Sequence, residues 1–288
     1  MNIKSLEAFL AVIDNKTMSA AADKLFTTQP NISLMIKELE NYYSTKLFNR
    51  ISKRLYLTPE GIKLEKYARR VIIDFKKMNE VMFSQSKIIR IGSSVTVGQY
   101  LLNGYLNKLK SIMKNVEFEV VIDNTAEIEG LILDNRIDIA IVEGKINSKN
   151  IIQVEILKDE LIAVIGYDYP LLNDIKKLSD LELLPWISRE DGSRHRNQFE
   201  IDLNERNIHP QVVFRATNLE TVIQAVENKY GFTIISKIAA KEGLKKQSLK
   251  ELNFADYSCP RSIRYIYNKS LDKDPIIYQI LDCINNKL

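Results

Sequence analysis

The chain has 288 residues, of which 45% are hydrophobic and 27% are charged, a balance that supports buried cores and excludes an intrinsically disordered protein. A chain of this length suits two or three domains. No apolar run reaches the roughly 18 residues that a membrane span needs, and the charged N-terminal stretch does not fit a signal peptide. With two cysteines, we expect a soluble cytoplasmic protein without a disulfide framework, a metal site or a cofactor.

The net charge of +4 is unevenly distributed along the chain. Residues 1–87 contain 15 Lys or Arg and 9 Asp or Glu, a balance of +6, whereas residues 88–288 contain 26 and 28, a balance of −2. Clustered cations favour binding to the phosphate backbone of nucleic acid, because binding releases counterions. The distribution therefore indicates an N-terminal nucleic-acid-binding segment followed by a body with a different task.

The first part of the chain has the apolar periodicity of three short helices, over residues 3–13, 18–26 and 28–43. Thr17 can cap the second helix and Thr28 the third. Pro30 stands in the first turn of the third helix, where a missing N–H costs nothing. Two short helices joined by a tight turn, the second with polar residues at its N-terminal end, are typical of a helix-turn-helix.

Two short strands and a long helix follow. Residues 47–50 and 55–57 read as strands, and the basic tip between them forms a wing. Thr58 can cap a helix that extends to about Phe83. Apolar residues of this helix recur at alternating spacings of 4 and 3, at Leu64, Ala68, Val71, Phe75, Met78 and Met82. We expect this heptad seam to pair with a second copy of the chain, although an amphipathic helix lying on its own domain shows the same pattern.

From residue 88 onward, short β-branched runs alternate with helical segments, which indicates α/β sheets with parallel strands. The expected strands are 88–91, 118–122, 137–142, 152–157, 161–165, 212–215, 232–235 and 263–267. About 200 residues of this kind fit two subdomains of similar size around one cleft.

Residues 6–64 resemble the N-terminal signature of LysR-type transcriptional regulators. The match consists of fixed spacings: Leu6-x-x-Phe9, Ala20-Ala21-Ala22-x-x-Leu25, Thr28-Gln29-Pro30-x-Ile32-Ser33, Ile36-x-x-Leu39-Glu40, Leu47-Phe48-x-Arg50 and Leu57-Thr58-x-x-Gly61. A looser resemblance continues through residues 91–98, 124–128, 137–144 and 230–236. The chain looks most like the cysteine-regulon-like branch of the family, whose members respond to small sulfur- or nitrogen-related metabolites.

The resemblance implies a multidomain protein with a winged helix-turn-helix over residues 1–58 and a dimerising linker helix over 59–87. An α/β effector domain of two lobes, similar to periplasmic binding proteins, would follow. The chain would cross between the lobes near residues 159–162 and 262–265. The first lobe would comprise 88–160 and 266–288, and the second lobe 161–265. The implied function is sequence-specific transcription regulation, modulated by a small anionic effector between the lobes.

We expect the N-terminal end of the third helix to enter the major groove, where short polar side chains reach base edges. Gln29 can form two hydrogen bonds with adenine, and Lys37 would reach the backbone. Leu34 stands where many relatives carry arginine, so we expect an apolar contact there. Lys53 and Arg54 would contact a minor groove or a phosphate, or are simply solvated loop charges. The expected DNA-binding residues are Thr28, Gln29, Pro30, Asn31, Ser33, Leu34, Lys37, Lys53 and Arg54.

Two hydroxyl-rich turns are the candidate effector site. Ser93, Ser94 and Thr96 lie between an expected strand and a helix, and suit a small anion or carboxylate; ordinary helix capping explains each of them singly. Residues 191–196 open a second helix where relatives often have Gly-Ser-Gly-Thr-Arg. Arg194 and His195 depart from that pattern and would narrow the pocket and make it more positive. The expected effector-binding residues are Ser93, Ser94, Thr96, Thr125, Glu143, Ser193, Arg194, His195, Arg196 and Thr217.

An enzyme is the main alternative class, and the sequence disfavours it. It contains no Gly-x-Gly-x-x-Gly after a strand, no Walker A sequence, no nucleophile elbow and no metal spacing around His195 and His209. An effector-independent DNA-binding protein stays open, and so does a redox-responsive regulator that uses Cys259 and Cys283, although buried structural thiols are favoured. The expected partners are double-stranded promoter DNA, a second copy of the chain in a dimer or tetramer, RNA polymerase and a small anionic metabolite, with no membrane.

Overall fold

The computed structural model describes residues 2–51, 54–83, 87–170, 175–190 and 194–285. Within these ranges the side chains of 50, 51, 54, 81, 194–197 and 285 are not described. The chain divides into two compact units, residues 1–88 together with 134–136, and residues 89–133 together with 137–288. We call residues 2–83 the head and residues 87–285 the body.

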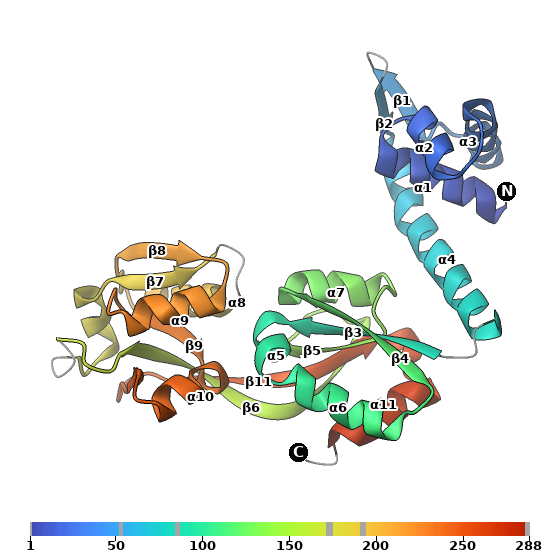
Figure 1. The fold of residues 1–288 in the computed structure, drawn as a ribbon. Coiled ribbons are helices and arrows are strands. Elements are labelled where there is room, and N and C mark those ends of the chain that lie inside the picture. The colour runs from blue at the N-terminus through green and yellow to red at the C-terminus, as the bar shows by residue number, and fades with distance from the viewer. Residues whose placement is uncertain (1, 52–53, 84–86, 171–174, 191–193, 286–288) are drawn as a thin grey trace. The chain divides into compact units, whose positions relative to one another are not determined.

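The head consists of three helices, a two-stranded hairpin and a long helix (Figure 1): α1 (Ile3–Asn15), α2 (Met18–Lys24), α3 (Gln29–Tyr43), β1 (Phe48–Ile51), β2 (Arg54–Leu57) and α4 (Pro59–Phe83). Side-chain caps fix three of the helix starts, because a cap oxygen satisfies an N–H that has no partner within the helix. Asn2 accepts from the Ser5 N–H at 2.8 Å and Thr17 from the Ala20 N–H at 3.1 Å. Thr58 accepts from the Gly61 N–H at 2.9 Å.

One apolar core holds the head together. It draws on α1, α2, α3 and α4, with Phe9, Ile32 and Leu39 at its fully buried centre. Phe48 of the hairpin packs on Phe9 with ring centroids 5.3 Å apart. Burial of each such side chain stabilises the fold by about 1.5–3 kcal/mol. These contacts therefore fix the position of α3 in the head.

The body begins with a lobe whose elements are β3 (Lys87–Ser94), α5 (Val95–Tyr100), α6 (Leu102–Ile112), β4 (Val116–Asp123), α7 (Thr125–Leu133), β5 (Ile139–Glu143) and the first half of β6 (Ile151–Gly166). The second lobe contains β7 (Trp186–Arg189), α8 (Arg194–Glu205), β8 (Val212–Ala216), α9 (Leu219–Glu227), β9 (Thr233–Ser236), α10 (Lys237–Lys245) and β10 (Leu249–Leu252). The chain returns to the first lobe through β11 (Cys259–Asn268) and ends with α11 (Pro275–Asn285).

The large sheet has the order β10-β6-β11-β5-β3-β4, and β9 also pairs with β6. The expectation of parallel strands is right for the β3–β5 and β7–β8 pairs. It is wrong for the pairs that β6 and β11 make, which are antiparallel. The sheet is therefore mixed, because two strands that run between the lobes in opposite directions must pair antiparallel with each other.

The two crossing strands are long and continuous (Figure 1). The sequence predicted separate strands at 152–157 and 161–165, but both belong to the single 16-residue strand β6. Along this strand the partners change: residues 151–161 pair with β11, and residues 161–166 pair with β9 and β10. β11 already pairs with β5 of the first lobe from Ile263 onward, slightly earlier than the predicted boundary at 265/266.

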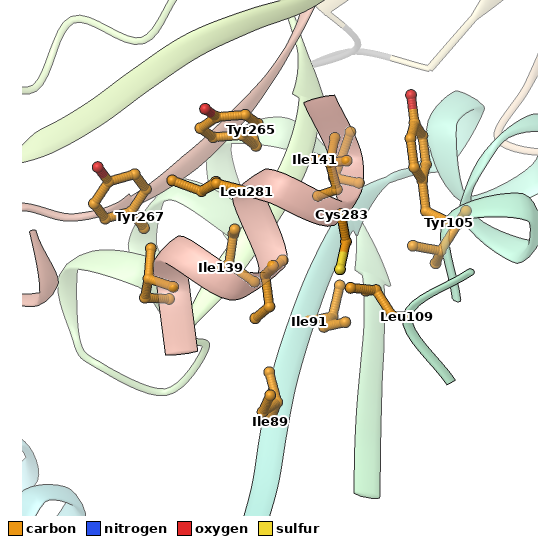
Figure 2. Close-up of a cluster of buried hydrophobic side chains, with 14 of the residues drawn as sticks. Ile89, Ile91, Tyr105, Leu109, Ile139, Ile141, Tyr265, Tyr267, Leu281 and Cys283 are labelled. Atoms are coloured by element: carbon orange, nitrogen blue, oxygen red, sulfur yellow. The ribbon is translucent and has the colours of Figure 1, made fainter. Parts of the chain in front are cut away.

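Separate apolar cores stabilise the two lobes. In the first lobe, side chains from β3, β5, β11, α6 and α11 interdigitate (Figure 2), among them Ile91, Ile141 and Leu281. In the second lobe, Trp186 stacks on Phe232 with centroids 6.1 Å apart and meets Phe199 edge-on at 5.6 Å. The core of the first lobe combines residues 89–141 with residues 263–284, so this lobe forms from two separate segments of the chain, whereas the core of the second lobe lies within residues 161–259.

A buried ion pair joins the two crossing strands. Asp159 of β6 and Arg261 of β11 are register partners, and Arg261 approaches the Asp159 carboxylate at 2.6 Å with side-chain exposures of 9% and 0%. The Ser236 hydroxyl donates to the same carboxylate, with its Oγ 2.9 and 2.8 Å from the two oxygens. Ser236 also caps α10. This cluster fixes β6, β11 and α10 to one another where the chain changes lobes.

Candidate DNA-binding surface and effector site

The N-terminal end of α3 is an exposed polar surface on a firmly anchored helix. Ile32, Ile36 and Leu39 bury one face of α3 in the head core, while Gln29 and Pro30 are exposed on its first turn. Thr28 occupies the N-cap position, but its side chain makes no cap hydrogen bond, contrary to the expected cap. Its hydroxyl is exposed beside Gln29, so the end of α3 presents short polar groups to its surroundings.

The other predicted residues of α3 differ in exposure. Asn31 is half-buried, and its amide donates to the Thr27 hydroxyl with a distance of 2.8 Å, which ties the helix start to the preceding turn. Ser33 is half-buried, whereas Leu34, 55% exposed, and Lys37 are open to solvent. The apolar contact expected of Leu34 is therefore sterically available.

The wing forms the predicted hairpin. β1 and β2 pair antiparallel, from Phe48 opposite Leu57 to Ile51 opposite Arg54, which leaves residues 52–53 as the connection. Lys53 lies outside the described residues, and of Arg54 only the backbone, in β2, is described. Their contacts with DNA stay a prediction.

The predicted seam of α4 divides into two parts. Ala68 is 1% exposed and packs with partly buried Leu64 in the core of the head, so these two residues serve the head itself, as the alternative interpretation expects. Val71, Met78 and Met82 are 43%, 51% and 72% exposed. The part of the seam that can meet a second copy therefore begins at Val71.

In the first lobe, three hydroxyl-bearing residues stand where β3 ends and α5 begins. Ser93 is fully buried and donates to the carbonyl of Ser94 at 2.9 Å. The hydroxyls of Ser94 and Thr96 are buried and have no hydrogen-bond partner among the described residues. Buried hydroxyls are normally hydrogen-bonded, so this pair suits a polar ligand or water better than a closed core.

Two other predicted residues lie close to this strand end. Ser93 pairs with Ile141 in the parallel β3–β5 ladder, so buried Glu143 ends β5 at the same edge of the sheet. Thr125 is buried at the start of α7, whose first N–H groups bond to the side chain of Asn124. The sheet edge therefore gathers Ser93, Ser94 and Glu143, three of the expected effector-binding residues.

Of the effector-binding residues predicted in the second lobe, the structure describes only some. Ser193 lies outside the described residues. Arg194, His195 and Arg196 form the first turn of α8, as expected, but their side chains are not described. Thr217 is exposed next to Asn218, the cap of α9.

A pocket of about 690 Å³ lies between β5, β11 and α8, and both lobes contribute to its wall. Of the predicted residues it contains Glu143. Sequence reasoning did not assign the other polar lining residues to this site; among them are Gln198 and Asp202 of α8, and Cys259, Arg261 and Arg264 of β11. Gln198 and Asp202 share a helix face at a spacing of four, but only the packing of α8 places that face against β11.

Tyr257 and Asp202 form a polar contact beside this pocket. The Tyr257 hydroxyl donates to Asp202 at 2.6 Å, and Gln198 donates to the other carboxylate oxygen at 2.9 Å. Burial first, and then the bond to Asp202, raise the pKa of Tyr257. The phenol therefore stays a hydrogen-bond donor and holds Asp202 in place.

The two cysteines are free and lie in different cores, Cys259 in the second lobe and Cys283 in the first (Figure 2). Burial is the main cause that raises the pKa of each thiol. Because the thiolate is the reactive form, both positions suit structural thiols.

Within the described residues, no group of three or more His, Cys, Asp or Glu side chains could hold a metal ion. In the same part of the chain, no helix combines the length and apolar character that crossing a bilayer requires.

A winged helix-turn-helix with a polar recognition helix, followed by a two-lobed body with a polar cleft, defines the class of DNA-binding regulators that carry a ligand-binding domain. Residues 3–62 match the bacterial regulatory helix-turn-helix protein, lysR family, and residues 84–288 match the LysR substrate binding domain. The chain belongs to the LysR family of DNA-binding transcription regulators, and the predicted family and fold are confirmed. Relatives of this family are transcriptional regulators, in agreement with the expectation of a non-enzyme.

Relatives span the whole chain. The HTH-type transcriptional regulator CysL of Bacillus subtilis is 27% identical over 272 residues, which cover 93% of this chain and 91% of the relative. An uncharacterized HTH-type transcriptional regulator of Methanocaldococcus jannaschii is 30% identical over 273 residues, with 92% and 91% covered.

Among solved structures, full-length CbnR with its target DNA has a TM-score of 0.70 at 17% identity and 99% coverage of both chains. Full-length OxyR of Pseudomonas aeruginosa has a TM-score of 0.69 at 16% identity, with 99% and 95% covered. These similarities show a shared fold.

Proposed function

We propose that this LysR regulator binds promoter DNA as a dimer, and that a small anionic effector held in the body modulates its activity. The exposed start of α3, with Thr28, Gln29 and Pro30, would read the major groove. Asn31, Ser33, Leu34 and Lys37 would support the contact, and Lys53 and Arg54 of the wing would bind beside it. A solved relative of similar fold, CbnR, is in complex with its target DNA.

Pairing would use the exposed part of the α4 seam. Val71, Phe75, Met78 and Met82 follow one another at spacings of 4, 3 and 4, and three of them are largely open to solvent. A narrow apolar stripe with this heptad period is buried most completely when it packs against the same stripe of a second copy. Two heads held in this way would match a dyad-symmetric DNA site.

The single observation that carries the effector proposal is a pair of buried hydroxyls without a hydrogen-bond partner among the described residues, those of Ser94 at the end of β3 and of Thr96 in the first turn of α5. A carboxylate or an inorganic oxyanion accepts hydrogen bonds from such groups and would satisfy both. Ser193, Arg194, His195 and Arg196 at the start of α8, with Thr125, Glu143 and Thr217, would complete the site. The effector would then favour one arrangement of the lobes over another.

A thermal-shift screen tests this site, with sulfate, phosphate and small carboxylates as probes. A ligand at a hundred times its dissociation constant stabilises the folded state by about 2.7 kcal/mol, which is several degrees for the body. We expect the double substitution Ser94→Ala, Thr96→Val to abolish the shift. Ser111→Ala, which changes an exposed serine of α6, is the matched control. A shift that survives in the double variant would place the anion elsewhere.

The redox alternative has less support. Cys259 and Cys283 sit in separate cores and both are buried, so a bond between them would require both cores to open. The effector-independent alternative predicts that none of the probes changes DNA binding or stability.

A further inference from the structure

Helix α8 connects the candidate effector site with the core of the second lobe. Phe199 and Leu203, one helical turn apart, are buried in that core. Gln198 and Asp202, also one turn apart, line the pocket to which both lobes contribute. The first turn of the same helix consists of predicted effector-binding residues, 194–196. Whatever fixes α8 therefore also fixes the place of this turn.

A tyrosine from another segment of the second lobe holds α8 on its pocket side. The Tyr257 hydroxyl donates to Oδ2 of Asp202 at 2.6 Å, while the Gln198 amide donates to Oδ1 at 2.9 Å. Both carboxylate oxygens of Asp202 thus have a donor. Hydrogen bonds to a carboxylate are about twice as strong as those between neutral groups, so this bond firmly joins α8 to the segment that carries Tyr257.

Two further contacts fix the tyrosine ring. Phe199 of α8 meets it edge-on, with ring centroids 6.0 Å apart, and the Arg206 guanidinium carbon lies 5.6 Å from its centroid. Burial is the main cause that raises the pKa of Tyr257. The phenol therefore keeps its proton at neutral pH and acts as a permanent hydrogen-bond donor.

Tyr257 stands at the point where the chain leaves the second lobe. It precedes by two residues Cys259, the first residue of the crossing strand β11. Two residues further along, Arg261 forms the buried ion pair with Asp159. The bond to Asp202 therefore connects α8 with the strand that runs between the lobes, beside the pocket that both elements line.

We infer that Tyr257 is a positioning residue for the effector: its bond to Asp202 holds α8 where the first turn of the helix can meet the anion. The inference rests on the proposed effector function and adds a residue that is not itself part of the pocket wall. A binding turn that is already in place needs no ordering when the ligand arrives, which raises the affinity. Without the hydroxyl, α8 keeps its apolar face in the core but loses this connection to β11.

Trp186, the single tryptophan of the chain, can report on the position of α8. Its ring meets Phe199 edge-on with centroids 5.6 Å apart, and Phe199 in turn meets Tyr257. A shift of α8 against the core therefore changes the surroundings of the indole ring, and the fluorescence of Trp186 follows it.

The test compares two tyrosines whose hydroxyls each donate to an aspartate. Tyr257→Phe removes the bond to Asp202. Tyr267→Phe, the matched control, removes a bond of 3.0 Å to Asp272 from a ring in the core of the first lobe (Figure 2). Each full-length variant is titrated with sulfate, phosphate and acetate, and Trp186 fluorescence and the melting temperature are recorded. Hydrogen exchange of the α8 amides is measured without anion.

We expect Tyr257→Phe to raise the dissociation constant of the bound anion about tenfold, roughly the contribution of one hydrogen bond to a charged group. The α8 amides should also exchange faster in this variant. Tyr267→Phe should keep the dissociation constant within about twofold of the unmodified chain, because its hydroxyl lies in the other lobe, away from α8.

A conservative variant separates positioning from general destabilisation. Asp202→Asn keeps an oxygen that accepts from the Tyr257 phenol and removes a negative charge near the site, so it should bind the anion at least as well as the unmodified chain. A loss of affinity in this variant would overturn the inference. Unchanged affinity in Tyr257→Phe would overturn it as well, and so would equal losses in Tyr257→Phe and Tyr267→Phe.

The exchange measurement distinguishes this inference from the proposed effector function. No response of the unmodified chain to any of the three anions would count against the effector function. Faster exchange of α8 in Tyr257→Phe alone would then still support the connection to β11, and equal exchange in Tyr257→Phe and Tyr267→Phe would overturn it.

Discussion

The head and the body are stabilised by contacts of very different range along the chain. The core of the head joins residues from Leu6 to Ile72, and the residue directly before each of α1 and α2 caps that helix. The first lobe of the body, in contrast, packs Ile89 of its first strand in one cluster with Ile284 of its last helix. The head can therefore form from local signals, whereas the first lobe closes only when nearly the whole length of the body is present.

The largest expected effect concerns the crossing strands of the body. Arg261→Ala should lower the free energy of unfolding of the body by about 3–5 kcal/mol, because it leaves the Asp159 carboxylate buried without its cation. The single tryptophan, Trp186, lies in the second-lobe core, so its fluorescence during urea unfolding reports on the body alone.

The same strand offers a control for this substitution. Arg264 forms an ion pair with Glu155 at 3.3 Å, with side-chain exposures of 21% and 46%. Such a partly solvated pair contributes no more than about 1 kcal/mol, so Arg264→Ala should have a small effect. Equal losses for both variants would contradict the role given to the buried pair.

A smaller effect is expected in the linker helix, which connects head and body. Met78→Glu should raise the dissociation constant of the proposed dimer by about 30-fold or more, because each copy would bury an unpaired carboxylate at the seam. Lys76→Glu changes the charge of the same helix outside the seam. Sedimentation at a series of protein concentrations measures the dimer dissociation constant of both variants. An unchanged dissociation constant for Met78→Glu would show that the dimer interface lies outside α4.

Within the head, two substitutions should separate sequence reading from general affinity. Gln29→Ala should change the base preference at one position of the selected site by about tenfold, since a good bidentate pair contributes 1–3 kcal/mol of discrimination. Lys53→Ala should weaken binding to all sequences alike and reduce the salt dependence. Competition binding with a set of single-base variants measures both. Uniform weakening by Gln29→Ala would refute the assigned base contact.

The smallest expected effect is that of oxidation. Both thiols have pKa values raised by burial, so at neutral pH they stay protonated and unreactive. Treatment with peroxide should change DNA affinity by less than about twofold. A large change that Cys259→Ser or Cys283→Ser abolishes would restore the redox alternative.

The residues that the sequence located well are those whose signal is local. The caps at Thr17 and Thr58 and the hairpin between Phe48 and Leu57 follow from residue types and short spacings. Thr28 is the exception. It occupies the predicted N-cap position of α3, but its hydroxyl makes no cap hydrogen bond.

The strands that sequence reasoning missed or divided lie in the body. β7 and β10 were not predicted, and β6 was taken for two strands because polar residues around Asp159 interrupt its apolar pattern. Asp159 is buried and paired only because Arg261 of β11 lies alongside. The apolar pattern of one strand does not reveal which other strand pairs with it and buries its polar residues.

By itself, the sequence determined the family, the helix-turn-helix and the long helix α4, because spacing within a few turns of helix carries that information. It also placed Ser93, Ser94 and Thr96 between a strand and a helix, since strand ends are local features. Tertiary structure alone decided that Arg261 and Asp202 line the pocket and that Ala68 belongs to the head core. Exposure and pairing depend on what packs against a residue, and for these residues the neighbours come from elsewhere in the chain.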